Sequence, residues 1–275
     1  MESLELKAIA NEMRKDIIRM LEAAGSGHPG GSLSCIDMLT ALYFGGVLKH
    51  DPNDPKLPDR DYFILSKGHA APALYATLAH AGYFPVDELA TLRKLGSRLQ
   101  GHPDSSLVPG VEVGTGSLGQ GLSISAGLAA GARLDGAGQT VFTILGDGEC
   151  QEGQVWEAAT FAAHQKLDNL VAIVDGNGLQ IDGATTDVCQ VGDLGDKFAA
   201  FGWDVHRVDG HDIDAMIELF NALKADRSGK PHLVAATTVK GKGVSFMENQ
   251  AGWHGKAPNA DQAAQALTEL EEGGR

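Results

Sequence analysis

The chain has 275 residues, 43% of them hydrophobic and 21% charged, which is typical of a globular protein and argues against a disordered chain. Its formal net charge is −14 and no basic patch is visible, so a nucleic-acid partner is not expected. Three well-separated cysteines and an N-terminus without the apolar core of a signal peptide argue against a disulfide scaffold and a membrane protein, and we expect a cytoplasmic location.

Two helices open the predicted fold. Apolar residues recur at helical spacing between Leu6 and Leu21, and Gly25 is suited to end that helix. A second helix is predicted over Ser32–Phe44, where apolar side chains share one face. The polar, proline-broken stretch Lys49–Arg60 predicts a loop.

Beyond this loop, apolar strands alternate with amphipathic helices. Strands are predicted at Tyr62–Leu65, Val141–Leu145, Leu170–Val174, Trp203–Val208 and His232–Val239. Helices are predicted at Ala70–His80, Leu118–Arg133, Val155–Gln165 and Asp212–Ala225. Continuously apolar strands separated by helices indicate an α/β fold, with a doubly wound parallel sheet flanked by helices on both faces. We expect one domain over residues 1–258, followed by a polar tail, 259–275, that forms a loosely docked helix.

Polar or glycine-rich turns follow four of the predicted strands. They are Ser66–His69, Gly146–Gly148, Asp175–Asn177 and Lys240–Gly243. Open parallel sheets bind ligands beyond the carboxyl ends of their strands. The sequence therefore predicts a binding site at this edge of the sheet.

Asp147 and Asn177 have the chemistry of ligands for a hard cation. A carboxylate and an amide oxygen suit the oxygen shell of Mg²⁺, which phosphate oxygens commonly complete. Gly146 and Gly148 flank the aspartate and allow the backbone to approach a phosphate closely. The Gly-Asp-Gly tripeptide alone is usually just a turn that ends a strand. The asparagine at the end of the following strand makes the metal site the better interpretation.

A second glycine motif, Gly114–Gly119, matches the GxGxxG fingerprint of dinucleotide-binding proteins. Its context is wrong for that function. The segment before it is broken by Pro109 and Gly110 and makes a poor strand, and the expected acidic residue is missing because Asp135 lies in a glycine-rich loop. A nicotinamide cofactor is therefore not expected.

Four histidines lie in glycine-flanked turns: His28, His69, His102 and His254. Proton transfer or oxyanion stabilisation near neutral pH is the function we expect for them. Zinc is not expected, because no HExxH motif or comparable ligand spacing is present. Four other histidines are interpreted as exposed residues without a function: His80, His164, His206 and His232.

Taken together, these motifs resemble the transketolase family in its N-terminal, diphosphate-binding half. In family order they are Gly27–Ser34, Leu65–Ala76, Gly101–Asp104, Thr115–Leu122, Gly146–Ala158, Asp175–Gly183, and a TTVKGKGVSF segment that leads to Trp253–Gly255. They cover nearly the whole chain. The resemblance implies the diphosphate-type fold that binds thiamine diphosphate, together with Mg²⁺ or another divalent cation such as Ca²⁺ or Mn²⁺.

The resemblance also implies roles for individual residues. Metal ligands would be Asp147, Asn177 and the carbonyl of Leu179. Cofactor contacts would come from His69, Gly148 and Asn177, with Gly116, Ser117 and Leu118 along the cofactor. Catalytic residues around the reacting carbon of the ketose would be His28, His102 and His254. Glu152 and Glu157 match acidic positions near the subunit interface of family dimers, and an exposed helix face explains them nearly as well.

Two positions depart from the family pattern. Ser117 stands where many relatives have proline, and Gly176 where an aspartate is frequent. Neither change removes a ligand named above, so they affect the fine geometry and not the binding.

The family also has a second domain that holds the pyrimidine ring, with an activating glutamate, and a third, C-terminal domain. No segment of this chain is assignable to either. The chain thus resembles the small subunit of split, two-chain transketolases. Such an enzyme would act in the pentose phosphate pathway and move a two-carbon ketol unit between sugar phosphates. Its partner would be a C-terminal subunit carrying the pyrimidine-binding domain, in an α2β2 assembly.

Two alternatives stay open at this point. One is the diphosphate-binding subunit of another thiamine diphosphate enzyme, such as a 2-oxo acid dehydrogenase component. The other is a non-catalytic regulatory paralogue. The early GHPG, the SKGHAAPALYA turn and the late WHG favour transketolase, and the intact site residues argue against a paralogue that has lost its activity.

Overall fold

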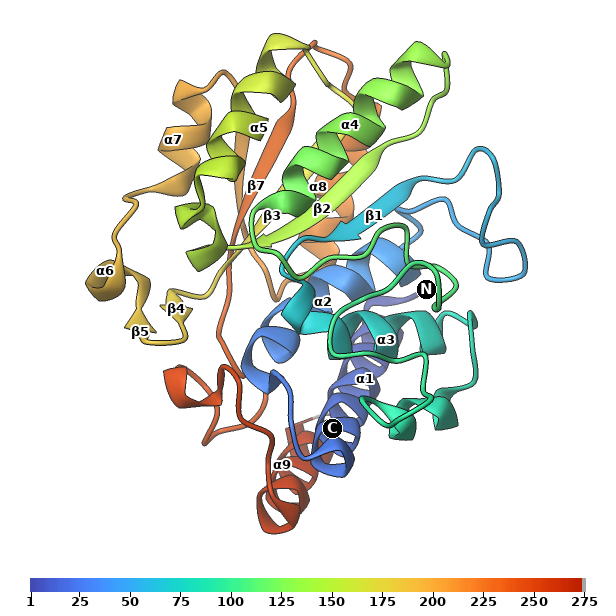
Figure 1. The fold of residues 1–275 in the computed structure, drawn as a ribbon, viewed down its shortest axis with the longest axis vertical. Helices are drawn as coiled ribbons and strands as arrows, with labels where there is room; N and C mark the ends of the chain where they lie inside the picture. Colours follow the sequence, from blue (N-terminus) through green and yellow to red (C-terminus); the bar gives the residue numbers. More distant parts are fainter. Residues whose placement is uncertain (274–275) are drawn as a thin grey trace.

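Five parallel strands form the central sheet, in the order β1-β2-β3-β7-β6 (Figure 1). The computed structural model describes residues 1–273, so the last two residues of the expected tail, Gly274 and Arg275, lie outside the described residues. The strands are β1 (Tyr62–Leu65), β2 (Val141–Gly146), β3 (Leu170–Gly176), β6 (Asp204–Asp209) and β7 (His232–Thr237). The expected α/β class with a parallel sheet is confirmed.

Helices cover both faces of the sheet (Figure 1). One layer contains α1 (Ser3–Ala24), α2 (Pro29–Phe44), α3 (Ala71–His80) and α8 (Ile213–Ala225), and the other contains α4 (Gln120–Leu134), α5 (Gly153–His164) and α7 (Leu194–Ala200). Strands covered on both faces must be apolar at nearly every position. β2 illustrates this, because all its residues from Val141 to Leu145 are buried.

Helix α2 is the most enclosed of these helices. Every residue from Pro29 to Tyr43 is buried, because α1, α3 and α8 all pack against it. It begins at Pro29, three residues before the predicted start, since proline suits the first position of a helix. His28 is the residue that precedes the helix, and this fixes its backbone at the edge of the core.

The C-terminal helix, α9 (Ala260–Gly273), packs against α1. It is docked more closely than the polar sequence predicts. Ala263, Ala266 and Leu270 are buried, and the Asn11 side chain donates a hydrogen bond of 2.8 Å to the carbonyl oxygen of Leu270. Two alanines and a leucine at helical spacing form the buried stripe, and the polar and charged residues lie between them along the sequence.

Several short elements were not predicted from the sequence. They are β4 (Leu179–Gln180), β5 (Gly183–Ala184), α6 (Thr185–Val188), α7, and the 3₁₀ helices Gly68–Ala70, Val86–Thr91, Gly148–Gln151 and Ala251–Trp253. Most are too short for a hydrophobic period to show. Within residues 1–273, no helix combines the length and the apolar character that a bilayer crossing requires.

The interpretation of four histidines as exposed residues is wrong for three of them. His232 is fully buried as the first residue of β7, and His206 lies on β6. His80 ends α3 and lies 2.8 Å from the Asp16 carboxylate. Only His164, at the end of α5, is exposed as expected. His206 and His232 are covered because β6 and β7 pair with each other, and His80 is covered because α3 contacts α1. These contacts join segments that are far apart in the sequence, so a local pattern does not predict them.

Candidate functional site

The four polar turns predicted from the sequence follow β1, β2, β3 and β7. These strands are adjacent and parallel, so the turns lie at the same edge of the sheet. A cavity of about 320 Å³ opens there. Its lining includes His28, Gly31, Lys67, His69, Gly116, Leu118, Asp147, Gly148, Asn177, Leu179, Lys240 and His254.

Asp147 is held at the end of β2 by two backbone amides. The Gly148 amide donates to Oδ1 over 2.7 Å, and the Gly178 amide donates to Oδ2 over 2.5 Å. Burial is the main cause that raises the pKa of this carboxyl, and the nearby Asp175 adds to it. A bound cation would relieve both effects, because it stabilises the ionised form.

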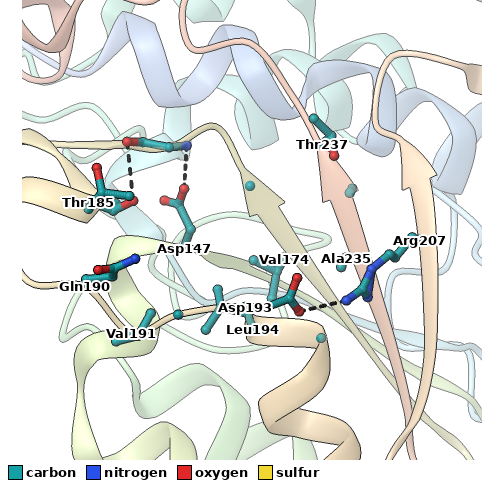
Figure 2. A pocket seen from close by; sticks show the side chains of 16 residues that line it. Asp147, Val174, Thr185, Gln190, Val191, Asp193, Leu194, Arg207, Ala235 and Thr237 are labelled. Carbon is teal, nitrogen blue, oxygen red and sulfur yellow. Dashed lines mark hydrogen bonds and ion pairs between the residues drawn. The ribbon is translucent and has the colours of Figure 1, made fainter.

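Asp147 also lines a second pocket, next to Gly178, and Figure 2 shows the residues around that pocket. The Gly178 backbone lies between Asp147 and Thr185, whose hydroxyl donates to the Gly178 carbonyl oxygen over 3.4 Å. Asp193 and Arg207 form an ion pair of 2.8 Å farther along the same pocket. The loop after β3 is thus fixed from both sides.

Asn177 and Leu179 bring two further oxygen atoms to the cavity. The Asn177 side-chain oxygen accepts a hydrogen bond of 3.1 Å from the Leu179 amide, and its side-chain nitrogen donates to Asp175 over 3.2 Å. The carbonyl oxygen of Leu179 accepts a hydrogen bond of 3.0 Å from the Lys240 ammonium. With Asp147, the cavity therefore offers a carboxylate, an amide oxygen and a carbonyl oxygen, the donor types that Mg²⁺ prefers.

Lys240 is a site residue that the sequence patterns did not identify. It lies in the turn after β7, which stood out only for its glycines, and its side chain is almost fully buried. Burial is the main cause that lowers its pKa to about 8, and the charge of Lys67 adds to it. A lysine in a glycine-rich turn after a strand was the available signal.

A buried ion pair lies beneath the cavity. The Lys67 ammonium donates to the Asp175 carboxylate and, over 2.8 Å, to the Gly31 carbonyl oxygen. Ser34 donates to the same carboxylate over 2.5 Å, and Thr238 donates to its other oxygen. Although burial opposes ionisation, these partners hold the pKa of Asp175 below its usual value. The network joins α2 to the ends of β1, β3 and β7.

Glu149 makes a second buried connection that the sequence did not reveal. Its carboxylate accepts hydrogen bonds from the Ser66 hydroxyl and, over 2.9 Å each, from the amides of Gly119 and Gly146. It therefore ties the end of β1, the start of α4 and the end of β2 together. Burial raises the pKa of this carboxyl.

Three histidine rings meet at the cavity. The ring centroids of His28 and His69 are 5.1 Å apart, those of His69 and His254 5.0 Å, and those of His28 and His254 5.6 Å. Burial first, and neighbouring cationic groups second, lower their pKa values to about 4, 2 and 3 for His28, His69 and His254. All three are neutral at pH 7.

Two of these histidines have a buried nitrogen without a partner. Within the part of the chain that the structure describes, Nδ1 of His28 and Nδ1 of His254 make no hydrogen bond. Buried polar atoms are nearly always paired in folded proteins, and the exceptions call for a ligand or an ordered water. The two nitrogen atoms are therefore suited to contact a bound molecule.

His102 and Ser117 lie outside this cavity. Both line a neighbouring recess, and His102 is exposed. Gly116 lines the main cavity and also packs against His102, because a Cβ atom at this glycine would lie 2.7 Å from the His102 ring. His28, His69 and His254 therefore share one cavity, and His102 lines the neighbouring recess. Likewise, Gly116 and Leu118 line the main cavity, whereas Ser117 does not.

The outer rim of the cavity is partly apolar and exposed. Leu118 is 36% exposed and Ile181 is 68% exposed. Glu152 lies on the same rim, and Glu157 is exposed on α5. Within residues 1–273, Ile181 thus remains exposed beside Glu152 on this rim.

Comparisons with known proteins agree with one another. Residues 6–271 match the family model described as transketolase, thiamine diphosphate binding domain. The chain is 43% identical over 273 residues to a 6-deoxy-6-sulfo-D-fructose transketolase subunit from Clostridium sp. (strain MSTE9), an alignment that covers 99% of this chain and 98% of that protein. It is 44% identical over 271 residues to one of the subunits of an apulose-4-phosphate transketolase from Phocaeicola vulgatus, covering 98% and 95%.

Solved structures show the same relationship. The transketolase from Campylobacter jejuni superposes with a TM-score of 0.91 at 32% identity, over 98% of this chain and 43% of that one. The transketolase from Leishmania mexicana gives a TM-score of 0.91 at 33% identity, over 98% and 42%. The chain therefore spans less than half of these solved transketolases and nearly all of the two subunits above.

Proposed function

Because this chain belongs to the transketolase family, we propose that it is the diphosphate-binding subunit of a two-chain transketolase. In this proposal it transfers a two-carbon ketol unit between sugar phosphates and is active only with a partner subunit. The observation that carries the proposal is the cavity in which Asp147, Asn177 and Leu179 offer oxygen donors beside Lys240 and three neutral histidines.

We assign different residues of the cavity to different parts of thiamine diphosphate. Asp147, Asn177 and the Leu179 carbonyl would hold Mg²⁺, or Ca²⁺ or Mn²⁺ in its place. Gly148, His69 and Lys240 would contact the diphosphate, and Gly116 to Leu118 would line the rest of the cofactor. Gly148 supports this, because a Cβ atom there would lie 3.1 Å from Gln180 Cβ and narrow the cavity. When bound, the cofactor supplies the centre that stabilises negative charge on the two-carbon fragment.

The histidines would act on the substrate. His28 and His254 are neutral at pH 7, and among residues 1–273 the Nδ1 atom of each has no partner, so they can donate or accept a hydrogen bond without first losing a proton. Such fixed donors stabilise the charge that develops on substrate oxygens. His102, in the adjacent recess, would contact the sugar as it enters.

The partner in this proposal is a C-terminal transketolase subunit. It would carry the pyrimidine-binding domain and its activating glutamate, and two copies of each chain would form a cytoplasmic α2β2 assembly. Support comes from relatives of the same length, which are named as subunits. The symmetric pairing is the commonest way to close such an assembly.

The sugar is proposed only as a class. Relatives at nearly equal identity, 43% and 44%, are named for a sulfo-sugar and for apulose 4-phosphate. Sequence identity to these relatives therefore does not distinguish between the two sugars, and we propose an anionic ketose as the substrate class. The 2-oxo acid dehydrogenase alternative gains no support, because the matching family model is that of transketolase.

The test is an assay of the chain with and without its partner. The chain alone, with Mg²⁺, thiamine diphosphate and a ketose–aldose phosphate pair, should show no turnover. Activity should appear on adding the candidate partner subunit. Turnover by the lone chain would refute the two-chain proposal, and a correctly assembled complex without ketol transfer would favour the non-catalytic paralogue.

A further inference from the structure

Two histidines and an aspartate meet at the end of the sheet that is remote from the cavity. Asp204 is the first residue of β6, and His232 is the first residue of β7. The cavity lies at the carboxyl ends of the parallel strands, and the length of β7 separates the two ends by about 17 Å. The group is therefore independent of the site described above.

Parallel pairing places the three side chains on one face of the sheet. Asp204 lies opposite His232 in the register, and His206 follows two residues along β6. Residues two apart on a strand point to the same face, as do register partners on neighbouring strands. The Asp204 Oδ2 atom is 2.9 Å from His206 Nε2 and 3.5 Å from His232 Nδ1, and all three donor atoms lie within 4.8 Å of one another.

His232 is buried in an unusual state. It is fully buried, and among residues 1–273 neither of its ring nitrogens has a hydrogen-bond partner. Leaving such a group unpaired is costly, so a ligand at this point would remove a real penalty. Burial is the main cause that lowers its pKa, although the carboxylates of Asp226 and Asp204 oppose this shift.

A second carboxylate faces the other side of the same ring. Asp226, which ends α8, has its Oδ2 atom 3.9 Å from His232 Nε2. A carboxylate behind a histidine is the usual outer partner of a metal-bound imidazole, where it fixes the orientation of the ring. Asp226 lies on the side of the ring where such a partner is found, although at 3.9 Å it is beyond hydrogen-bond distance in this structure.

We propose that Asp204, His206 and His232 bind a zinc-class dication, with water as the fourth ligand. Zinc takes imidazole and carboxylate donors at about 2.0–2.2 Å in a tetrahedron, which places the donors about 3.3 Å apart. The Asp204–His206 hydrogen bond of 2.9 Å and the Asp204–His232 separation of 3.5 Å lie on either side of this value, and the third separation, between the two imidazoles, is at most 4.8 Å. Two imidazoles exclude a site built for Mg²⁺ or Ca²⁺, which take oxygen ligands.

The ion has a route into the site and an effect on the fold. The side chains of His206 and Asp204 are 29% and 42% exposed, so solvent reaches the open coordination position. β6 is an edge strand that pairs only with β7, and the ion would tie the two together. An ion that binds only the folded chain raises the melting temperature, by about 2–3 °C at a tenfold excess over its Kd.

The experiment is a titration with Co²⁺, which reports tetrahedral coordination by its visible absorption, and then with Zn²⁺. Mg²⁺ and thiamine diphosphate are kept in excess so that the cofactor cavity is filled. The wild type and the control variant H164A, which lacks an exposed histidine on α5, should bind one ion. H206A and D204N should bind it at least tenfold more weakly, and Zn²⁺ should no longer raise their melting temperature.

Two results would overturn the proposal. One is an unchanged Co²⁺ affinity in both H206A and D204N. The other is a spectrum that disappears in H254A but persists in H206A, because the ion would then lie among the cavity histidines. Circular dichroism checks that each variant is folded, and H206Q, which keeps a polar side chain on the strand, replaces H206A if the latter unfolds.

Discussion

The Lys240 ammonium donates a hydrogen bond of 3.0 Å to the carbonyl oxygen of Leu179, one of the three oxygens that we assign to the metal. A positive charge is thus already placed at the edge of the proposed metal site. The side chain is buried, and it reaches the carbonyl from the turn after β7. Metal and lysine together would balance the negative charge of a diphosphate.

The first prediction follows from this contact. Replacing Lys240 by methionine should weaken thiamine diphosphate binding about 10- to 100-fold, since a hydrogen bond to a charged group contributes about 1.5–3 kcal/mol. Calorimetric titration with Mg²⁺ and the partner present measures the change. Lys242→Met is the matched control, because Lys242 is only partly buried and lies 3.9 Å from Glu248. Equal affinities for the two variants would remove Lys240 from the site.

The second prediction concerns Asp147. Alanine at this position should abolish Mg²⁺-dependent cofactor binding, because water cannot replace the charge of a carboxylate that faces a divalent ion and a diphosphate. The same titration, repeated over a range of Mg²⁺ concentrations, tests it. Asp187→Ala removes an exposed carboxylate on α6 and should have no effect. Unchanged affinity in the Asp147 variant would refute the metal assignment.

The third prediction separates catalysis from binding. His28→Ala and His254→Ala should each lower kcat about 10²- to 10³-fold, the usual loss for one preorganised donor, and should change cofactor affinity much less. Steady-state kinetics of the two-chain enzyme gives kcat, and calorimetry gives the affinity. His164→Ala serves as the control. Small and equal effects on both quantities would mean that the two histidines do not act on the substrate.

The fourth prediction concerns the stability of the buried pair below the cavity. Lys67→Met should lower the free energy of unfolding by about 3–5 kcal/mol, because it leaves the charge of Asp175 buried without its partner. Adding Asp175→Asn to the same chain should recover part of the loss. Urea denaturation measures both variants. Lys49→Met, which breaks an exposed pair with Asp59, should leave the free energy of unfolding nearly unchanged.

The fifth prediction is a pH dependence of the chain without cofactor. The cavity histidines have pKa values of about 4, 2 and 3, below the ordinary value of 6.5. Below pH 6.5 the unfolded chain therefore binds more protons than the folded chain, so stability is full above pH 6.5 and falls as the pH drops toward 4. Each histidine contributes at most about 1.4 kcal/mol per pH unit, and His28 and His254 contribute less because they are partly exposed.

Thermal unfolding at pH 7 and pH 5 measures this dependence. The double variant His28→Asn/His254→Asn should show a smaller difference in melting temperature between the two pH values than the wild type. His164→Asn should keep the full difference, because that histidine is exposed. An identical difference in all three proteins would show that the cavity histidines do not titrate as proposed.

The sequence predicts the sheet and the position of the site, because both depend on local patterns. Apolar runs mark the strands, and parallel strands collect the turns that follow them at one edge. Asp147 and Asn177 were recognised for this reason. Lys240 and Glu149 were not, because their roles come from burial and from contacts with segments far away in the chain. The hydropathy of a single segment does not show which of its polar residues become buried or which distant residues they contact.

His232 shows the same limit at the opposite end of the sheet. Nothing in its own segment indicates that it faces Asp204, because the contact depends on the register between β6 and β7. A metal motif with fixed spacing is visible in a sequence when its ligands lie on one helix or loop, or within one short supersecondary unit. Ligands that parallel pairing brings together have no such spacing.

The network around Asp175 has a kinetic consequence for the proposed assembly. This carboxylate is already held by hydrogen bonds from Lys67, Ser34 and Thr238 in the chain without a partner. These side chains therefore lose no further conformational freedom when a second chain binds. In the proposed assembly, this part of the cavity would be ready for the cofactor both before and after the second chain binds. The route taken in a cell would be set by the concentrations of cofactor and partner, and not by a slow folding step on this side of the interface.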